Sequence, residues 1–254
     1  MPPLETRQKR LVNVPPLARL FLTGQGLSQP EIILALDVDT LESAADFVDK
    51  LYPKIKTFKV GSHLFTAYGP EIIRMLHRKG AEVFLDLKYF DIPNTVAKAV
   101  AAAARLKVKM LTLHISGGKE MIEAAVFSAE AQAKALNIAK PLLIGVTVLT
   151  SRPAKPKDVL ALAKKGIGSG LDGIVCSAVE AGILRKKIKK GFFIVTPGIR
   201  PEKAAADDQR RTATVRQAVE AGSNFLVIGR PILESANPLV KAEELLGDIM
   251  NASF

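Results

Sequence analysis

The chain alternates short apolar segments with helix-like segments eight times, and this repeat restricts its fold more than any other feature. The apolar segments are rich in β-branched residues and read, in order, EIILALDV from 31, TFKVGS from 57, AEVFLDLK from 81, MLTLHI from 110, PLLIGVTVL from 141, DGIVCSA from 172, FFIVTPG from 192 and FLVIGRP from 225. Their starts lie 20 to 33 residues apart, which is the length of one strand and one helix. Several of the intervening stretches end in glycine, as helices often do.

Near-continuous apolar strands that alternate with helices indicate a parallel sheet covered by helices. Eight such units within residues 31–254 predict an α/β fold, a single (β/α)8 TIM barrel, which typically needs about 250 residues. A doubly wound open sheet is the alternative, but it usually has a glycine-rich loop after its first strand, and here that strand ends ALDVDT. Residues 1–30 form an N-terminal extension without clear periodicity, which we expect to be a strap across the barrel or a disordered tail.

Composition and charge exclude several classes of protein. No window approaches 18 consecutive apolar residues, so we expect no segment to span a membrane. The lone cysteine, Cys176, excludes an internal disulfide and a multi-cysteine metal site, and it fits a cytoplasmic protein. The net charge of +11 suits nucleic acid or small anions, but 6% aromatic residues without tryptophan are few for base stacking. We interpret the densest basic run, RKKIKK at 185–190, as a solvated helix C-terminus.

The third apolar segment and its exit, FLDLKYFDIPNT (84–95), hold three charges within six residues: Asp86, Lys88 and Asp91. Because side chains alternate along a strand, Asp86 and Lys88 share one face, and Leu85 and Leu87 share the other. We expect the leucines to face the helices and the two charges to face the barrel axis.

Polar side chains also stand at other predicted C-terminal strand ends, where TIM barrels place their active sites: Asp37, Lys59, His114, Thr150, Ser151, Arg200 and Arg230. Lys59 can approach the charges of the third strand, so we expect one network of alternating charges. A purely structural salt-bridge network is the alternative, since such networks occur without chemistry. Apolar residues would fill that space without electrostatic cost, which argues against it.

The segments TPGIRP and VIGRPI follow the seventh and eighth strands, where TIM barrels commonly bind phosphate. Gly198 and Gly229 let the backbone approach an anion, and Arg200 and Arg230 offer forked donors to phosphate oxygens. The long polar stretch 198–212 resembles a mobile lid, and Gln209 within it can reach the phosphate or a polar edge of the substrate.

Eight motifs in order, ALDVD, FKVGSHLF, DLKYFDIPNTV, VTVLTS, DGIVCSA, TPGIRPE, DDQRRTATV and VIGRPI, resemble the orotidine 5′-phosphate decarboxylase family over about residues 31–240. The D-x-K-x-x-D run followed by IPNT is highly specific. The resemblance implies a homodimer that converts orotidine 5′-monophosphate to uridine monophosphate and carbon dioxide, the last step of pyrimidine synthesis. It implies no metal, no organic cofactor, and neither nucleic acid nor membrane as a partner.

The resemblance also implies a role for each matched residue. Lys88 is similar to the general acid that protonates C6 of the pyrimidine, and Asp86 to the carboxylate beside the substrate carboxylate. Lys59 and Asp91 complete the charged network, Asp91 from the partner subunit. The remaining implied substrate contacts are Asp37 and Thr95 at the ribose (Thr95 across the dimer interface), Thr150 and Ser151 near the pyrimidine, and Arg200, Gln209, Gly229 and Arg230 around the phosphate. Pro197 is a further predicted substrate contact.

Three alternatives remain open on the sequence. A magnesium-dependent phosphosugar enzyme of the same superfamily has a similar D-x-K-x-x-D run, and carboxylates at 37, 86 and 91 suit the ion, although IPNT and Gln209 argue against it. A Schiff-base enzyme would use Lys88 as nucleophile, but an amine between two carboxylates stays protonated. An inactive basic barrel that serves as a binding scaffold is the third, and the presence of every charge that the chemistry needs argues against it.

Overall fold

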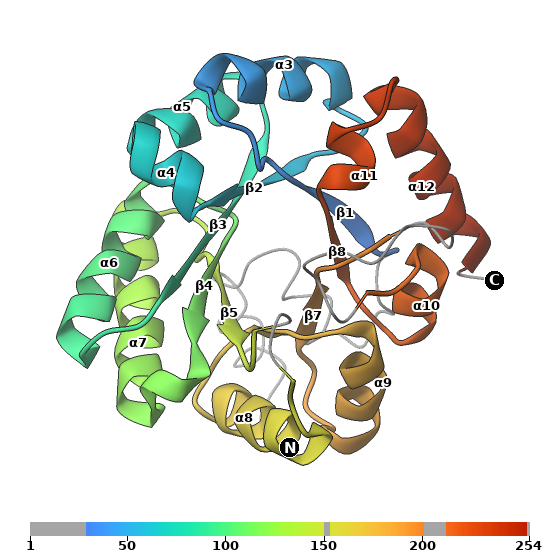
Figure 1. Cartoon of the computed structure of the whole chain (residues 1–254). Helices are drawn as coiled ribbons and strands as arrows, with labels where there is room; N and C mark the ends of the chain where they lie inside the picture. The colour runs from blue at the N-terminus through green and yellow to red at the C-terminus, as the bar shows by residue number, and fades with distance from the viewer. Residues whose placement is uncertain (1–28, 150–152, 201–211, 253–254) are drawn as a thin grey trace, which may run out of the picture.

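The computed structural model describes residues 29–149, 153–200 and 212–252, and these form a closed barrel of eight parallel strands. Each strand pairs with its neighbours in sequence, and β1 pairs with β8 to close the ring (Figure 1). The strands are β1 (Glu31–Ala35), β2 (Thr57–Gly61), β3 (Glu82–Tyr89), β4 (Met110–His114), β5 (Leu142–Val146), β6 (Gly173–Val175), β7 (Phe193–Thr196) and β8 (Phe225–Ile228). The predicted TIM barrel is confirmed, and each predicted apolar segment supplies one strand.

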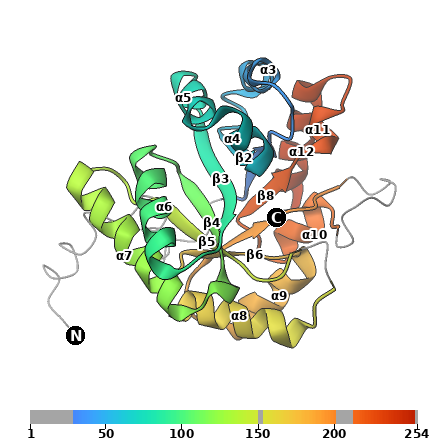
Figure 2. The same cartoon turned by 60° about the vertical axis from the view of Figure 1, so that its left-hand side comes forward.

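Helices surround the barrel on its outer side (Figures 1 and 2). They are α3 (Leu41–Leu51), α4 (Ser62–Tyr68), α5 (Pro70–Arg78), α6 (Pro93–Arg105), the 3-10 turn η1 (Ile115–Gly117), α7 (Lys119–Leu136), α8 (Pro156–Gly168), α9 (Ala178–Lys187), α10 (Val215–Glu220), α11 (Arg230–Leu233) and α12 (Pro238–Ala252). The short helix α4 is additional to the sequence-based expectation. It ends at Gly69, whose φ of 54° breaks the helix before Pro70 starts α5.

Local sequence explains where the main helices begin and end. Thr40 caps α3, because its hydroxyl accepts the Ser43 N–H at 3.1 Å. Ser177 and Glu180 form a capping box at the start of α9: the Ser177 hydroxyl accepts the Glu180 N–H, and the Glu180 carboxylate accepts the Ser177 N–H. Asn137 ends α7 in the left-handed region, with φ of 51°. Thr40 and Ser177 thus end the loops that follow β1 and β6, and Asn137 ends α7 before β5.

Two apolar cores hold the barrel together. The inner core fills the barrel and consists of Ile33, Ala35, Phe84, Met110, Leu142, Ile144, Phe193, Val195, Phe225 and Val227. The larger outer core lies between the strands and the helices, and it includes Leu85, with Leu87 packed against it. The expected outward direction of these two leucines is therefore confirmed.

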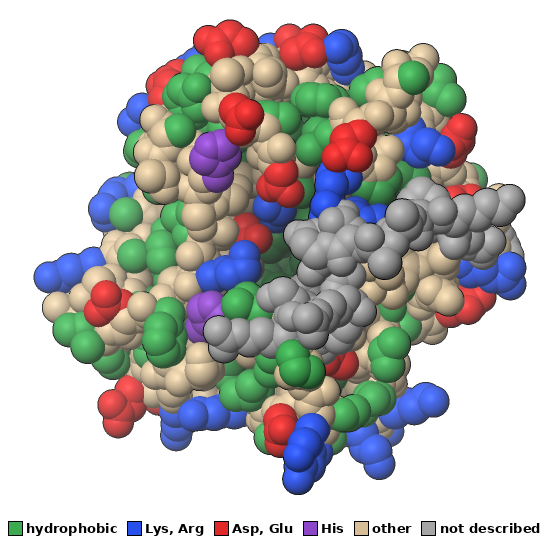
Figure 3. Space-filling model, in the orientation of Figure 1, with side chains coloured by type: hydrophobic (Ala, Val, Ile, Leu, Met, Phe, Trp, Pro, Cys, Tyr) green, Lys and Arg blue, Asp and Glu red, His purple; other side chains and the backbone are tan. Residues whose placement is uncertain are grey.

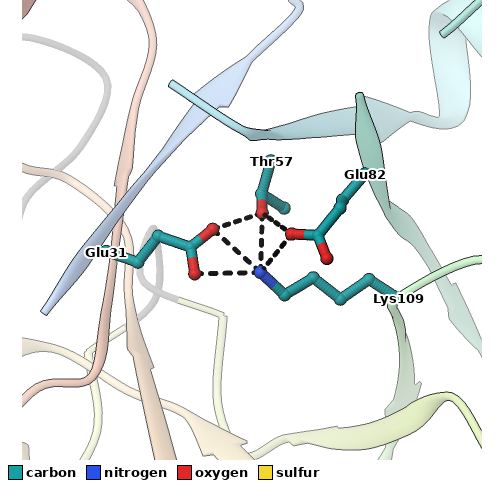
Figure 4. Close-up of polar contacts among 4 residues, drawn as sticks. All are labelled: Glu31, Thr57, Glu82 and Lys109. Carbon is teal, nitrogen blue, oxygen red and sulfur yellow. Dashed lines mark hydrogen bonds and ion pairs between the residues drawn. The ribbon is translucent and has the colours of Figure 1, made fainter. Parts of the chain in front are cut away.

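A partly buried ion cluster lies where neighbouring strands begin, at the N-terminal end of the barrel (Figure 4). The Lys109 ammonium lies 2.8 Å and 2.9 Å from the two Glu31 carboxylate oxygens, 2.7 Å from Glu82 and 2.8 Å from the Thr57 hydroxyl. It also lies 5.6 Å from the centre of the Phe225 ring, which is a cation–π distance. The cluster links β1, β2, β3, β4 and β8 beneath the inner core.

The interpretation of RKKIKK as a solvated helix end is wrong for its first residue. Arg185 is partly buried and donates to the Phe192 and Gly222 carbonyl oxygens and to Asn224, at 2.5 to 2.9 Å. Burial lowers its pKa to about 10, although the neighbouring Cys176 opposes this. Lys187 ends α9 as an exposed cation, as expected.

The N-terminal extension and the expected absence of a membrane span can be assessed only over the described residues. The extension lies almost entirely within residues 1–28, outside the described part, so its assignment as strap or tail stays a prediction. Within the described residues, no helix is long and apolar enough to cross a membrane.

Candidate active site

The carboxyl end of β3 departs from regular strand geometry at the charged residues. Leu85 pairs with Leu111 of β4 and Tyr89 pairs with Leu113, so four residues of β3 advance beside two residues of β4. Lys88 has a φ of 52°, in the left-handed region that residues other than glycine rarely adopt. The irregularity places Asp86 and Lys88 together at the mouth of the barrel, as predicted from their alternation with the leucines.

Four charged residues form a chain of alternating sign across β1, β2 and β3. The Lys88 ammonium lies 2.9 Å from Asp86 Oδ2, and the Lys59 ammonium lies 3.9 Å from the same oxygen. Lys59 also lies 3.1 Å from Asp37 Oδ1, just after β1. The expected contacts among Lys59, Asp86 and Lys88 are therefore present within one chain, Asp37 extends them, and Asp91 is not among them.

Asp86 is the most enclosed carboxylate of this chain of charges, with 13% of its side chain exposed. Burial acts to raise its pKa, but the ammonium groups of Lys59 and Lys88 and the hydrogen bonds from Lys88 and Thr112 outweigh it. The pKa of Asp86 therefore lies below its ordinary value, and the carboxylate is charged at neutral pH.

Thr112 is a site residue that the sequence-based argument did not single out. It lies in the middle of β4, is fully buried, and contacts both Asp86 and Lys88. The sequence signal that could have indicated Thr112 is a hydroxyl within the otherwise apolar strand MLTLH, two residues before His114.

His114 is half-buried at the end of β4 and packs edge-on against Phe90, with ring centres 5.8 Å apart. Burial and the nearby Lys88 lower the pKa of His114, although Asp86 opposes this.

The predicted phosphate-binding residues lie on the other side of the same mouth. Pro197, Gly198 and Arg200 follow β7, and Gly229 and Arg230 follow β8, where Arg230 begins the short helix α11. Gly198 has a φ of 77°, which requires glycine or strains another residue. In the ring of eight strands β7 is opposite β3 and β8 is next to β7, so both arginines stand on loops across the mouth from the Asp86–Lys88 pair.

A cavity of about 250 Å³ separates these two walls. Its polar lining consists of Asp37, Lys59, Asp86, Lys88, Arg200 and Arg230, and its apolar lining includes Ala35, Phe84, Val146, Val175, Val195 and Val227 of the barrel strands. Figure 3 shows this face hollowed near its centre, with acidic and basic side chains gathered around the hollow. The cavity is open at one end and closed below by the inner core.

The remaining predicted residues lie elsewhere or outside the described part. Asp91 and Thr95 are exposed at the start of α6, and Asp91 accepts the Ile92 N–H at 2.6 Å. No ion pair joins Asp91 to the described residues of the charged chain, so its predicted role across a dimer interface stays a prediction. Thr150, Ser151 and Gln209, together with most of the expected lid, fall on residues that the structure does not describe.

This arrangement defines a class of protein: a TIM-barrel enzyme with a fixed chain of charges and a pair of arginines at the carboxyl ends of its strands. The orotidine 5′-phosphate decarboxylase / HUMPS family model matches residues 30–245. This chain therefore belongs to that family.

Individual relatives agree with the family model. Orotidine 5′-phosphate decarboxylase of Vibrio cholerae is 47% identical over 230 residues, which cover 86% of this chain and 98% of the relative. The enzyme of the same name from Coxiella burnetii is 46% identical over 231 residues, covering 87% and 97%. The crystal structure of orotidine 5′-phosphate decarboxylase from Lactobacillus acidophilus superposes with a TM-score of 0.76 at 36% identity, covering 87% of this chain and 99% of that one.

Proposed function

We propose that this chain removes the carboxylate of orotidine 5′-monophosphate to form uridine monophosphate and carbon dioxide, the last step of pyrimidine nucleotide synthesis. Relatives that are 46–47% identical over nearly their whole length carry the name of this activity. The observation that carries the proposal for this chain is the Lys88–Asp86 pair, 2.9 Å apart, facing a cavity whose opposite wall holds two arginines. In this proposal Lys88 places a cation at the reacting carbon, and the two arginines bind the phosphate separately.

The phosphate is the part of the substrate that the β7 and β8 loops bind in this proposal. Arg200 and Arg230 supply charge-assisted hydrogen bonds to its oxygens, while Pro197, Gly198 and Gly229 shape the backbone around it. The base then extends across the mouth towards β3. Binding energy from the phosphate offsets the unfavourable approach of the substrate carboxylate to Asp86.

Lys88 is the proton donor of the proposed reaction. When the bond between C6 and the carboxylate breaks, its electron pair stays on C6, in the plane of the ring and outside the π system. An ammonium held in place beforehand stabilises this charge, and its proton then passes from Nζ to C6. Asp86 holds that ammonium at 2.9 Å. Lys59 links Asp86 to Asp37, which binds the ribose hydroxyls in this scheme.

The other assignments come from the family resemblance. Thr150 and Ser151 bind the pyrimidine, and Gln209 closes on the phosphate from the lid. Asp91 and Thr95 serve the site of a second subunit in a cytoplasmic homodimer. Their exposure supports this, and so do the exposed Phe90, Ile92 and Phe127, with 61%, 66% and 73% of their surface accessible.

The magnesium-dependent alternative finds no specific support in the geometry. Asp86 Oδ1 accepts from Thr112 and Oδ2 from Lys88, so both oxygens of this carboxylate already have hydrogen-bond donors. Within the described residues, no group of three acidic, histidine or cysteine side chains is arranged to hold an ion.

The decisive experiment follows the loss of ultraviolet absorbance of orotidine 5′-monophosphate on adding purified protein, with EDTA present. We expect rapid turnover by the wild type and a loss on the order of 10⁴-fold in Lys88→Ala, because that variant lacks both the proton and the stabilising charge. Lys164→Ala, an exposed lysine on α8, is the matched control and should keep full activity. Absence of turnover by the wild type would overturn the proposal, and turnover that EDTA abolishes would favour the magnesium alternative.

A further inference from the structure

The irregular end of β3 leaves three residues to be held by a single position of β4. Between the pairs Leu85–Leu111 and Tyr89–Leu113, the residues of β3 are Asp86, Leu87 and Lys88, whereas β4 contributes Thr112 alone. Regular ladder hydrogen bonds cannot serve this stretch, because the two strands advance at different rates. Another group must therefore hold the backbone of Lys88 in its left-handed conformation.

The hydroxyl of Thr112 does this and also holds the neighbouring carboxylate. Thr112 Oγ1 accepts the Lys88 backbone N–H at 2.9 Å and donates to Asp86 Oδ1 at 2.8 Å. The direction of both hydrogen bonds is fixed, because a backbone N–H only donates and an ionised carboxylate only accepts. One oxygen atom thus fixes the Lys88 backbone relative to the Asp86 carboxylate.

Thr112 itself has no access to the substrate. It is fully buried and does not line the cavity, whereas Asp86 and Lys88 do. Valine has nearly the same shape and would fill the same space, so packing alone does not call for a hydroxyl here. With valine at this position, the Lys88 backbone N–H would have no acceptor, and the largely buried Asp86 carboxylate would lose one of its donors.

We propose that Thr112 is a positioning residue for the reaction, which sets the place of the Lys88 ammonium relative to the substrate through the two hydrogen bonds of its hydroxyl. This inference rests on the proposed decarboxylase function. Thr112 should affect the rate of the chemical step, because Lys88 acts only when the bond to the carboxylate breaks. Substrate affinity should depend instead on the arginines on the opposite wall.

The test compares Thr112→Val and Thr112→Ser by steady-state kinetics and by binding of uridine monophosphate. We expect Thr112→Val to lower kcat by roughly 10- to 100-fold, since small displacements of a reacting group have effects of this size. KM and the Kd for uridine monophosphate should stay within about 3-fold of the wild type, because uniform binding is untouched. Thr112→Ser keeps the hydroxyl and should recover kcat to within about 5-fold.

Thr196→Val is the matched control. Thr196 is equally buried and pairs its hydroxyl with Ser223 at 2.6 Å, but neither residue lines the cavity. We expect this variant to melt at a lower temperature with kcat unchanged. Should Thr112→Val fail to fold, Thr112→Ala and Thr112→Ser form a second pair that differs by the hydroxyl alone.

The possible outcomes separate the two proposals. If the wild type decarboxylates its substrate but kcat of Thr112→Val stays within 3-fold of it, or falls equally in Thr112→Ser, the positioning role is overturned. A rise in KM with unchanged kcat would likewise assign Thr112 to binding. If the wild type shows no turnover, the proposed function fails instead.

Discussion

Asp86 is a largely buried carboxylate with three partners, and it shows how the site keeps its charges in place. Thr112 binds one of its oxygens, Lys88 binds the other, and Lys59 lies 3.9 Å from the latter. Burial by itself would favour the protonated acid, so the two ammonium groups decide the charge state and lower the pKa. The same contacts that serve the proposed reaction also tie three strands together.

The lowered pKa of Asp86 predicts how its contribution to stability depends on pH. A carboxyl group whose pKa is lower in the folded than in the unfolded state stabilises the fold when the pH is above its pKa in the unfolded chain. This stabilisation is lost as the pH falls through its pKa in the folded protein. We expect Asp86→Asn to lower the free energy of unfolding by about 1–3 kcal/mol near pH 7. The difference from the wild type should shrink below a pH of about 4.

Urea unfolding of both proteins between neutral and acid pH measures this difference. Asp46→Asn, a change at an exposed carboxylate of α3, is the control and should leave stability nearly unchanged. A gap between wild type and Asp86→Asn that widens towards acid pH would contradict the lowered pKa.

At the scale of elements, α9 is fastened to the barrel by a residue that belongs to its basic last turn. Arg185 donates through Nε and both terminal nitrogens to carbonyl and amide oxygens at the start of β7 and the loop before β8. Its guanidinium also lies 4.7 Å from the centre of the Phe192 ring. β7 and β8 carry the proposed phosphate loops, so Arg185 stabilises the wall beneath them.

Arg185→Ala therefore tests this connection between elements. We expect it to lower the free energy of unfolding by about 3 kcal/mol, because two backbone carbonyl oxygens and the Asn224 amide oxygen, all at least partly buried, lose their donor. Lys187→Ala, two residues further along the same helix and exposed, should change stability by less than about 0.5 kcal/mol. Denaturant unfolding of the two variants measures both values, and effects below about 0.5 kcal/mol in both would restore the interpretation of the whole run as solvated.

At the scale of the whole molecule, the two ends of the barrel have different roles. The carboxyl end holds the cavity and its charges, whereas the amino end is closed by the Lys109 cluster (Figure 4). Lys109 has 10% of its side chain exposed and touches residues of β1, β2 and β3. Residues at this end of a TIM barrel contribute to stability rather than to catalysis.

We expect Lys109→Ala to lower stability by about 1–2 kcal/mol, since Glu31 and Glu82 would lose their common cation but are partly exposed to water. The kcat and KM measured well below the melting temperature should not change, because the inner core separates the cluster from the cavity. Calorimetry and steady-state kinetics on the same preparation measure the two quantities. Lys107→Ala, at an exposed neighbour, serves as control, and a selective fall of kcat in Lys109→Ala would show coupling between the two ends.

The proposed dimer predicts complementation between two inactive variants. If Asp91 serves the partner's site, a heterodimer of Lys88→Ala and Asp91→Ala has one site with both changes and one with neither. Random subunit exchange of an equal mixture should then restore roughly a quarter of the wild-type activity. Recovery is measured after exchange in mild denaturant, and its absence in demonstrated heterodimers would show that Asp91 does not act across the interface.

Much of this molecule follows from the sequence by itself. The number and order of the strands, the direction of Leu85 and Leu87, and the gathering of Asp37, Lys59, Asp86 and Lys88 follow from periods of two and 3.6 residues and from barrel closure. These properties are local, or follow from one topological rule. The same rule brings Arg200 and Arg230 to the mouth.

The tertiary structure alone decided the contacts that hold these charges in place. Thr112 binds Lys88 across 24 positions of the chain, Arg185 reaches Asn224 across 39, and Lys109 reaches Glu31 across 78. No periodicity encodes such pairs, because each depends on the register between strands and on which buried polar groups lack a partner once the strands have closed. The sequence thus determined which charges meet at the mouth, and the closed barrel determined which neutral and basic side chains position them.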